Sequence, residues 1–177
     1  MTSCGIDQDS TIIVWDWAKG KILAKSTGHQ ERVFDLQFNP YKDNALVSCG
    51  IKQISFWNLI GNTLQKKKGI FGQVKDIQTM FCMAFSKEKE IYYTGTMNGQ
   101  VYVWEGNQLK EIIPGVHNGS IFTMVAVEDG FITGGKDGKI RTWDASFSPI
   151  DTIDIVLLMS ETAAPLNFIY NDGIEKI

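Results

Sequence analysis

Short apolar segments separated by turn residues run along most of the chain. Apolar and polar positions alternate at Phe34, Leu36 and Phe38 and again at Val101 and Val103, which is the period of a β-strand with one buried face. Other segments are apolar on both faces, as strands are when neighbouring sheets cover both of their sides. Between paired segments lie residues that accept positive φ or cap their own backbone, namely Asp7-Gln8-Asp9, Met97-Asn98-Gly99 and Lys136-Asp137-Gly138.

The predicted strands fall into four sets with no helix between them. The first set has a strand near the start of the chain and strands at 11–16 and 21–26, and it lacks a fourth strand. Three complete sets of four strands are predicted to begin near Arg32, Asp76 and Ser120. The pattern therefore predicts an all-β chain built from hairpins.

Four predicted strands end in tryptophan followed by a polar or acidic residue. The intervals between Trp15, Trp57, Trp104 and Trp143 are 42, 47 and 39 residues, and a period of about 40–45 residues is typical of one blade of a WD-repeat β-propeller. We therefore predict about four blades, fewer than the roughly six to eight of most closed propellers, and hence part of a larger or incomplete propeller. The predicted blades are 1–26 (partial), 27–68, 69–114 and 115–155, followed by an atypical C-terminal tail at 156–177.

One repeat, with His117, Thr133, Asp137 and Trp143, resembles the structural tetrad of the WD-repeat family. In that family the indole, hydroxyl, imidazole and carboxylate form a buried hydrogen-bond chain that ties the first strand of a blade to the following hairpin. An unpaired buried polar group costs about 1–3 kcal/mol, so the four residues are expected to stabilise the blade together. The other repeats are less complete, and their signature residues are Trp15, Asp16, His29, Ser48, Trp57, Thr94, Trp104 and Asp144.

Composition and charge exclude several classes of function. The chain has 17 basic and 20 acidic residues, a net charge of −3 and no basic stripe, so neither nucleic acid nor an anionic membrane is an expected partner. Its longest apolar run, at 155–159, is too short to span a bilayer. Cys4, Cys49 and Cys82 form no CxxC pair, which favours reduced thiols and a cytoplasmic location.

Longer motifs resemble one family within the WD-repeat class. The segments GIKQISFW, KKGIFG, YYTGTMNGQVYVWEGNQL and GFITGGKDGKIRTWD occur in order between Thr27 and Asp144, and this region is similar to the echinoderm microtubule-associated protein-like family. The resemblance implies a cytoskeletal role. Members of that family carry a tandem pair of atypical propellers and bind microtubules or soluble tubulin through propeller surface together with a basic or coiled-coil N-terminal region.

A few exposed positions are candidates for partner binding. Lys66, Lys67 and Lys68 could meet the acidic surface of tubulin, although such a run is more often the solvated end of an outer strand. Tyr41 and Phe71 are predicted in loops between strands, where propellers usually recruit ligands, and turn residues without a ligand occur at the same places. Lys42 and Asn118 share this position at blade rims.

Three functions compete, of which catalysis has the weakest support. The sequence has no phosphate-binding loop, nucleophile elbow or zinc motif, its histidines fall at the tetrad position, and Asp7 and Asp9 form an ordinary turn pattern. We therefore predict no enzyme activity, no cofactor and no metal. The first hypothesis is a cytoskeletal scaffold segment that associates with microtubules or tubulin, and the second is a general adaptor that binds peptides of another protein assembly.

Overall fold

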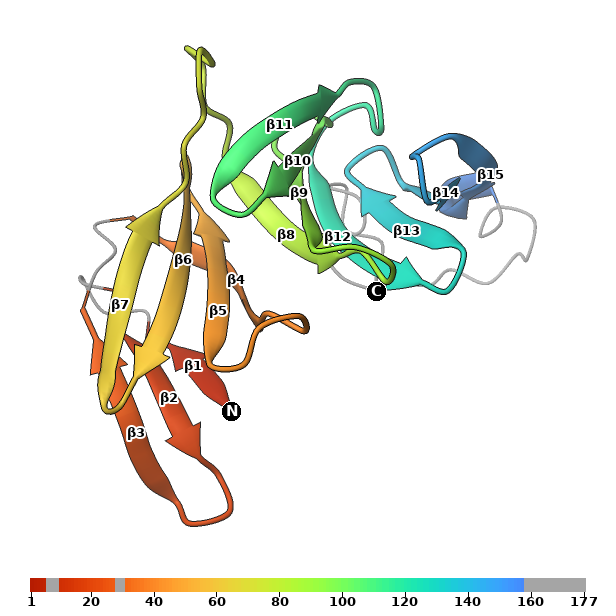
Figure 1. The fold of residues 1–177 in the computed structure, drawn as a ribbon. Helices are drawn as coiled ribbons and strands as arrows, with labels where there is room; N and C mark the ends of the chain where they lie inside the picture. Colours follow the sequence, from red (N-terminus) through yellow and green to blue (C-terminus); the bar gives the residue numbers. More distant parts are fainter. Residues whose placement is uncertain (6–9, 28–30, 158–177) are drawn as a thin grey trace. The chain divides into compact units, whose positions relative to one another are not determined.

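The computed structural model describes residues 1–5, 10–27 and 31–157. These residues form fifteen β-strands (Figure 1), and their one helical stretch is a short segment at 155–157, after the last strand. The prediction of an all-β chain is confirmed. The chain divides into two compact units, and each unit is described by itself below.

The first unit comprises Met1–Met80 together with Asn107–Leu109 and contains two antiparallel sheets. The first sheet has the order β1-β2-β3, with β1 at Thr2–Cys4, β2 at Ile12–Asp16 and β3 at Lys21–Ser26. The second sheet has the order β4-β5-β6-β7, with β4 at Val33–Phe38, β5 at Ala45–Gly50, β6 at Gln53–Ile60 and β7 at Thr63–Lys68. Apolar side chains from both sheets form one core that consists of Ile12, Val14, Ala24, Leu46, Trp57 and Leu64.

The second unit comprises Phe81–Gly106 and the described residues from Lys110 on. Its first sheet has the order β11-β10-β9-β8, with β8 at Met80–Phe85, β9 at Ile91–Thr96, β10 at Val101–Glu105 and β11 at Gln108–Ile113. Its second sheet has the order β12-β13-β14-β15, with β12 at Ile121–Val127, β13 at Gly130–Gly135, β14 at Lys139–Asp144 and β15 at Pro149–Asp154. The two sheets share a core that includes Tyr93, Val101, Ile121, Met124, Phe131, Trp143 and Phe147.

The central strands explain why the sequence lacks simple alternation. Every residue of β5 is buried, and in β10 only Glu105 is exposed. A strand that is covered on both faces has no solvent side on which polar residues would be favoured, so these segments are nearly continuous apolar runs.

The turns after the tryptophan strands differ in how they reach a left-handed backbone. Gly106 closes the β10–β11 turn at φ 57°, a conformation that glycine adopts without steric cost. In the β14–β15 turn the corresponding φ of 60° belongs to Phe147, whose ring is buried and stacks on Phe131 with centroids 4.6 Å apart. Burial of this ring offsets the cost of the unfavourable backbone.

One detail of the predicted strand map is wrong. The second complete set begins at Met80 and not near Asp76, because the chain bends at 75–76, where the Asp76 carboxylate accepts a hydrogen bond from Gln78 Nε2 at 2.6 Å. Phe38 shares the alternation of Phe34 and Leu36, yet it is 45% exposed at the end of β4. Alternation thus predicts the strand but not the burial of its last residue.

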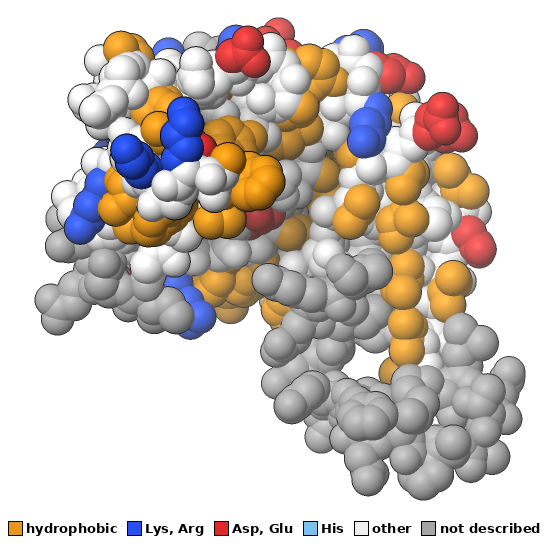
Figure 2. Space-filling model, turned by 90° about the horizontal axis from the view of Figure 1, so that it is seen from below, with side chains coloured by type: hydrophobic (Ala, Val, Ile, Leu, Met, Phe, Trp, Pro, Cys, Tyr) orange, Lys and Arg blue, Asp and Glu red, His pale blue; other side chains and the backbone are white. Residues whose placement is uncertain are grey.

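Large apolar side chains remain exposed in both units. They include Trp17, Ile22 and Leu23 in the first unit and Val125, Val127, Ile150 and Ile153 in the second. Figure 2 shows apolar surface on the face that it draws. Exposed apolar side chains on sheets are typical of surfaces that contact other protein segments.

Candidate functional site

The sheet β12–β15 brings the four predicted tetrad side chains into one hydrogen-bond chain. Trp143 Nε1 on β14 donates to Thr133 Oγ1 on β13 at 2.8 Å. His117, in the loop before β12, lies with Nε2 2.8 Å from Thr133 Oγ1 and with Nδ1 2.8 Å from Asp137 Oδ1 in the β13–β14 turn. The chain thus links a loop, a strand and a turn that are up to 26 residues apart, from His117 to Trp143.

The bonding pattern fits a neutral imidazole at His117. Because the Trp143 indole can only donate, the Thr133 oxygen accepts that bond and its own hydrogen is available to His117 Nε2, which leaves the imidazole proton on Nδ1 facing Asp137. Burial lowers the pKa of His117, although the hydrogen bond and charge of Asp137 act in the opposite direction, and the charge of Arg141 lowers the pKa further. A second proton would remove the acceptor that Thr133 uses.

Asp137 is held as a carboxylate by several donors. Burial by itself would raise its pKa, but the hydrogen bonds from His117 and from the backbone N–H of Asn118, with the charge of Arg141, lower the pKa below its ordinary value. Arg141 Nη2 lies 3.3 Å from Asp137 Oδ2, and the Asn118 nitrogen lies 3.1 Å from the same oxygen. Arg141 also donates to the carbonyl of Val116, so the charged groups tie the loop to the turn.

The lowered pKa of His117 predicts a pH dependence of stability. The unfolded chain binds a proton on this histidine near its ordinary pKa of 6.5, while the folded chain resists that proton, so the free energy of unfolding should fall as the pH falls below 6.5. The slope is at most about 1.4 kcal/mol per pH unit. Urea denaturation between pH 7.5 and 5.5, in a chain with His29→Gln so that His117 is the sole histidine, measures this slope. A flat profile over this range would contradict a neutral His117.

The other three sheets keep only the tryptophan and hydroxyl part of the tetrad in their described residues. Trp57 Nε1 donates to Ser48 Oγ at 2.9 Å, and Trp104 Nε1 donates to Thr94 Oγ1 at 3.1 Å. Trp15 Nε1 donates to Ser3 Oγ at 2.8 Å, and Ser3 is absent from the predicted signature set although its place upstream of Trp15 matches that of Ser48. His29 lies outside the described residues.

The turn position of the tetrad aspartate holds other residues in the second and third repeats. Lys52 occupies it at φ 50° in the β5–β6 turn. Asn98 occupies it in the β9–β10 turn, where its Oδ1 accepts a hydrogen bond from Thr96 Oγ1 at 2.7 Å. Asn98 thus bonds within its own hairpin, while Lys52 Nζ lies 4.0 Å from Asp76 Oδ1 in the segment before β8.

The acidic residues after the first and last tryptophans stabilise turns. Asp144 Oδ1 accepts hydrogen bonds from the backbone nitrogens of Ser146 and Ser148, each at 2.8 Å. Asp16 Oδ1 accepts one from the nitrogen of Lys19 at 3.2 Å. Their local role explains why a polar residue follows the tryptophan in these repeats.

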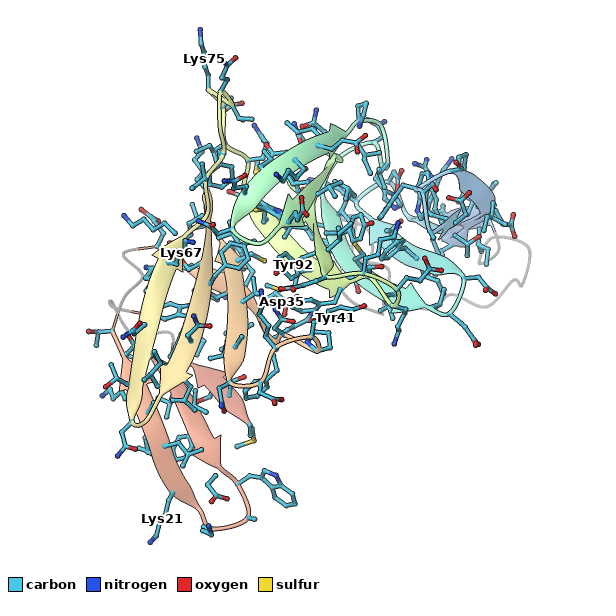
Figure 3. All side chains as sticks on the ribbon, in the orientation of Figure 1. Lys21, Asp35, Tyr41, Lys67, Lys75 and Tyr92 are labelled. Atoms are coloured by element: carbon cyan, nitrogen blue, oxygen red, sulfur yellow. The ribbon has the colours of Figure 1, made fainter. Side chains whose placement is uncertain are left out.

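The candidate partner-binding residues lie in the first unit, except Asn118 in the second unit, and they are not gathered at one place. Lys66 and Lys68 at the end of β7 and Phe71 in the following loop line one cavity. Lys67 does not line it, because successive side chains of a strand point to opposite faces. Tyr41 lies in the β4–β5 loop, well away from Lys67 (Figure 3), so the predicted set divides into a cavity group and two separate positions.

Repeated antiparallel sheets of this kind are typical of β-propeller blades. The family model described as "Echinoderm microtubule-associated protein first beta-propeller" matches residues 1–172. The chain belongs to this family. The prediction of WD-repeat propeller blades and the resemblance to the echinoderm microtubule-associated protein-like family are both confirmed, and the match extends beyond Thr27–Asp144 on both sides.

Individual members of the family are similar over most of the chain. "Echinoderm microtubule-associated protein-like 2" of Rattus norvegicus is 31% identical over 158 residues, which cover 86% of this chain and 24% of the relative. "Echinoderm microtubule-associated protein-like 1" of Mus musculus is 33% identical over 158 residues, covering 86% and 19%. The "77 kDa echinoderm microtubule-associated protein" of Lytechinus variegatus is 32% identical over 151 residues, covering 83% and 23%. The chain therefore spans about a quarter of the length of these relatives, or less.

The described residues of this propeller-family chain hold no group of three His, Cys, Asp or Glu side chains placed to bind a metal ion. Asp7 and Asp9, the acidic pair weighed for catalysis, lie outside the described residues. All three cysteines are reduced thiols, with Cys49 and Cys82 buried and Cys4 half-buried. Within the described ranges, no helix has the length and apolar character that crossing a membrane requires.

Proposed function

We propose that this chain is a non-catalytic protein-binding segment of a cytoskeletal scaffold that associates with microtubules or tubulin in the cytoplasm. The observation that carries the proposal is family membership over residues 1–172, together with relatives whose names describe microtubule-associated proteins. The reduced thiols of Cys4, Cys49 and Cys82 support a cytoplasmic location.

The end of β7 is the surface that we propose for this contact. Lys67 and Lys68 are exposed and Lys66 is half-buried, and an edge strand that ends in lysines is well placed to meet an acidic protein surface. Tyr41 offers a partly exposed aromatic ring at the β4–β5 loop, a residue type that is enriched at binding hot spots. The tetrad residues lie in the second unit and have a structural role in this proposal.

Co-sedimentation with polymerised and with soluble tubulin tests the proposal. We expect the chain to pellet with microtubules at low ionic strength and to be released by salt, since exposed lysines act through screened charge. The variant Lys66→Gln, Lys67→Gln, Lys68→Gln should bind about fivefold more weakly or worse, because each exposed ion pair contributes about 0.2–1 kcal/mol.

A matched control removes the same charge elsewhere in the first unit. The variant Lys19→Gln, Lys21→Gln, Lys25→Gln changes three lysines in β3 and the turn before it, and it should bind within about twofold of the parent chain. Absence of the parent chain from the pellet at low salt would contradict microtubule association. Affinity capture of other proteins, lost on mutation of the blade loops, would then favour the general adaptor.

A further inference from the structure

A cavity of about 180 Å³ opens at the end of β7 in the first unit. It lies between the β5–β6 turn, the first residues of β6 and the segment that follows β7. An engineered cavity of about 150 Å³ holds a benzene molecule, whereas sites for cofactors and drug-sized ligands measure about 300–1,000 Å³. The cavity therefore suits one side chain. Its lining includes Lys52, Lys66, Lys68 and Phe71.

The lining is strongly basic, with three lysines and no carboxylate among the described residues that form it. Lys66 Nζ lies 5.3 Å from the centroid of the Trp57 ring, which holds the ammonium group against the sheet. Burial, and then the charge of Lys68, lower the pKa of Lys66 below its ordinary value of 10.5. Holding these charges together is costly, and an anion in the cavity would offset that cost.

One counter-charge beside the lining lysines, that of Asp76, is loosely placed. Lys52 Nζ lies 4.0 Å from Asp76 Oδ1, and the two side chains are 65% and 80% exposed. An exposed pair at this distance contributes little stability. An incoming anion can therefore compete with Asp76 for Lys52.

The apolar wall is fixed by backbone hydrogen bonds. The nitrogen of Gly69 donates to the carbonyl of Ile54 at 3.0 Å, which holds the segment after β7 against β6. Within the same unit Ile70 accepts from the nitrogen of Leu109 at 2.9 Å and donates to the carbonyl of Asn107 at 2.8 Å. Phe71 thus follows two anchored residues, and a prepositioned ring loses little entropy on binding.

We propose that this cavity binds an anionic side chain of a peptide, with an apolar neighbour of that side chain packed against Phe71. Lysine ammonium groups attract carboxylate and phosphate alike as point charges, and Phe71 adds an apolar surface that a free inorganic anion would not use. This site rests on the proposed binding function and specifies the ligand of the β7 end as an acidic peptide, whichever protein supplies it.

Fluorescence anisotropy with labelled peptides on the full 177-residue chain tests this site without microtubules. The probes are a peptide of about ten residues in which glutamates flank a leucine, the same peptide with glutamine for glutamate, and the same peptide with phosphoserine for glutamate. The glutamine peptide should bind at least about tenfold more weakly than the better anionic peptide, a change of about 1.4 kcal/mol. The stronger of the two anionic probes identifies carboxylate or phosphate as the preferred group.

A pair of double variants separates the cavity from general surface charge. Lys52→Gln with Lys68→Gln removes two lining charges and should weaken binding about tenfold. Lys21→Gln with Lys75→Gln removes two charges outside the lining, from β3 and from a loop tip that stands apart (Figure 3), and should change affinity less than about twofold. Thermal melts check that both variants fold.

Peptide binding and co-sedimentation can fail independently of each other. Three results would overturn the site. The two double variants could lose affinity for the peptide equally, the glutamine peptide could bind as tightly as the anionic peptides, or neither anionic peptide could bind. Peptide binding without microtubule pelleting would keep the site and reject the microtubule proposal. If neither anionic peptide binds, while the variant Lys52→Gln with Lys68→Gln pellets with microtubules like the parent chain, the site is rejected and the microtubule proposal is kept.

Discussion

Replacement of Trp104 by alanine is expected to lower the free energy of unfolding of the second unit by about 3–5 kcal/mol. The side chain is 0% exposed, and it lies 6.4 Å from the ring of Tyr102 between centroids. Its removal leaves a cavity that the close-packed blade fills only in part, and it leaves the Thr94 hydroxyl without the indole donor at 3.1 Å. Urea denaturation followed by circular dichroism measures the change.

The chain offers a matched control for this substitution. Trp17 is 76% exposed, so Trp17→Ala deletes the same side chain with little change in burial and should alter stability by less than about 0.5 kcal/mol. Trp104→Phe keeps an aromatic ring but not the N–H and should cost about 1–3 kcal/mol. Losses of equal size for Trp17→Ala and Trp104→Ala would mean that Trp104 is not a core residue of its blade.

The repeats were predictable because the tetrad pairs are set by hairpin register. Thr94 pairs with Tyr102, and Trp104 pairs with Tyr92, so the hydroxyl and the indole are diagonal neighbours on one face of the sheet. Ser48 and Trp57 repeat this register in the β5–β6 hairpin, where Ser48 pairs with Ser55. A spacing of nine or ten residues between hydroxyl and tryptophan predicts the contact in these hairpins, whereas Ser3 makes it with Trp15 at a spacing of 12 residues.

The β7 cavity could not be predicted, because it depends on register and on a loop path. The sequence presents Lys66, Lys67 and Lys68 as one run, whereas the structure places Lys66 and Lys68 in the cavity and Lys67 outside it. Pairing of Ser55 with Lys68 also brings the β5–β6 turn beside the end of β7. Lys52 then joins lysines that are 14 and 16 residues away in sequence, and neither composition nor spacing signals this.

The left-handed turn at Phe147 could not be predicted from the sequence either, for a different reason. A buried phenylalanine at φ 60° contradicts local propensity, which favours glycine or asparagine there. The ring is held by Phe131, Tyr93 and Trp143 at centroid distances of 4.6, 5.0 and 6.0 Å. Tertiary packing therefore outweighs the backbone preference, and no local pattern in the sequence records it.

His117→Ala should lower the free energy of unfolding of the second unit by about 2–4 kcal/mol. The substitution leaves a void at a buried site and breaks both bonds of the imidazole, to Thr133 Oγ1 and to Asp137 Oδ1. Asp137→Ala should cost about 1–3 kcal/mol, because it also frees Arg141 from its partner at 3.3 Å. Asn98→Ala, at the same turn position of a repeat without a histidine, should cost less than about 1 kcal/mol.

A double-mutant cycle separates a connected tetrad from four independent contacts. If His117 and Asp137 act through one hydrogen-bond chain, the double variant loses less stability than the sum of the single variants, by about 1 kcal/mol or more. Additive losses would mean that each residue stabilises only its own segment. The same cycle at pH 5.5 should give a difference at least as large, because the hydrogen bond and the charge of Asp137 raise the pKa of His117, so that a protonated imidazole is bound more strongly by this carboxylate. A smaller difference at pH 5.5 would contradict a bond between the imidazole and a charged Asp137.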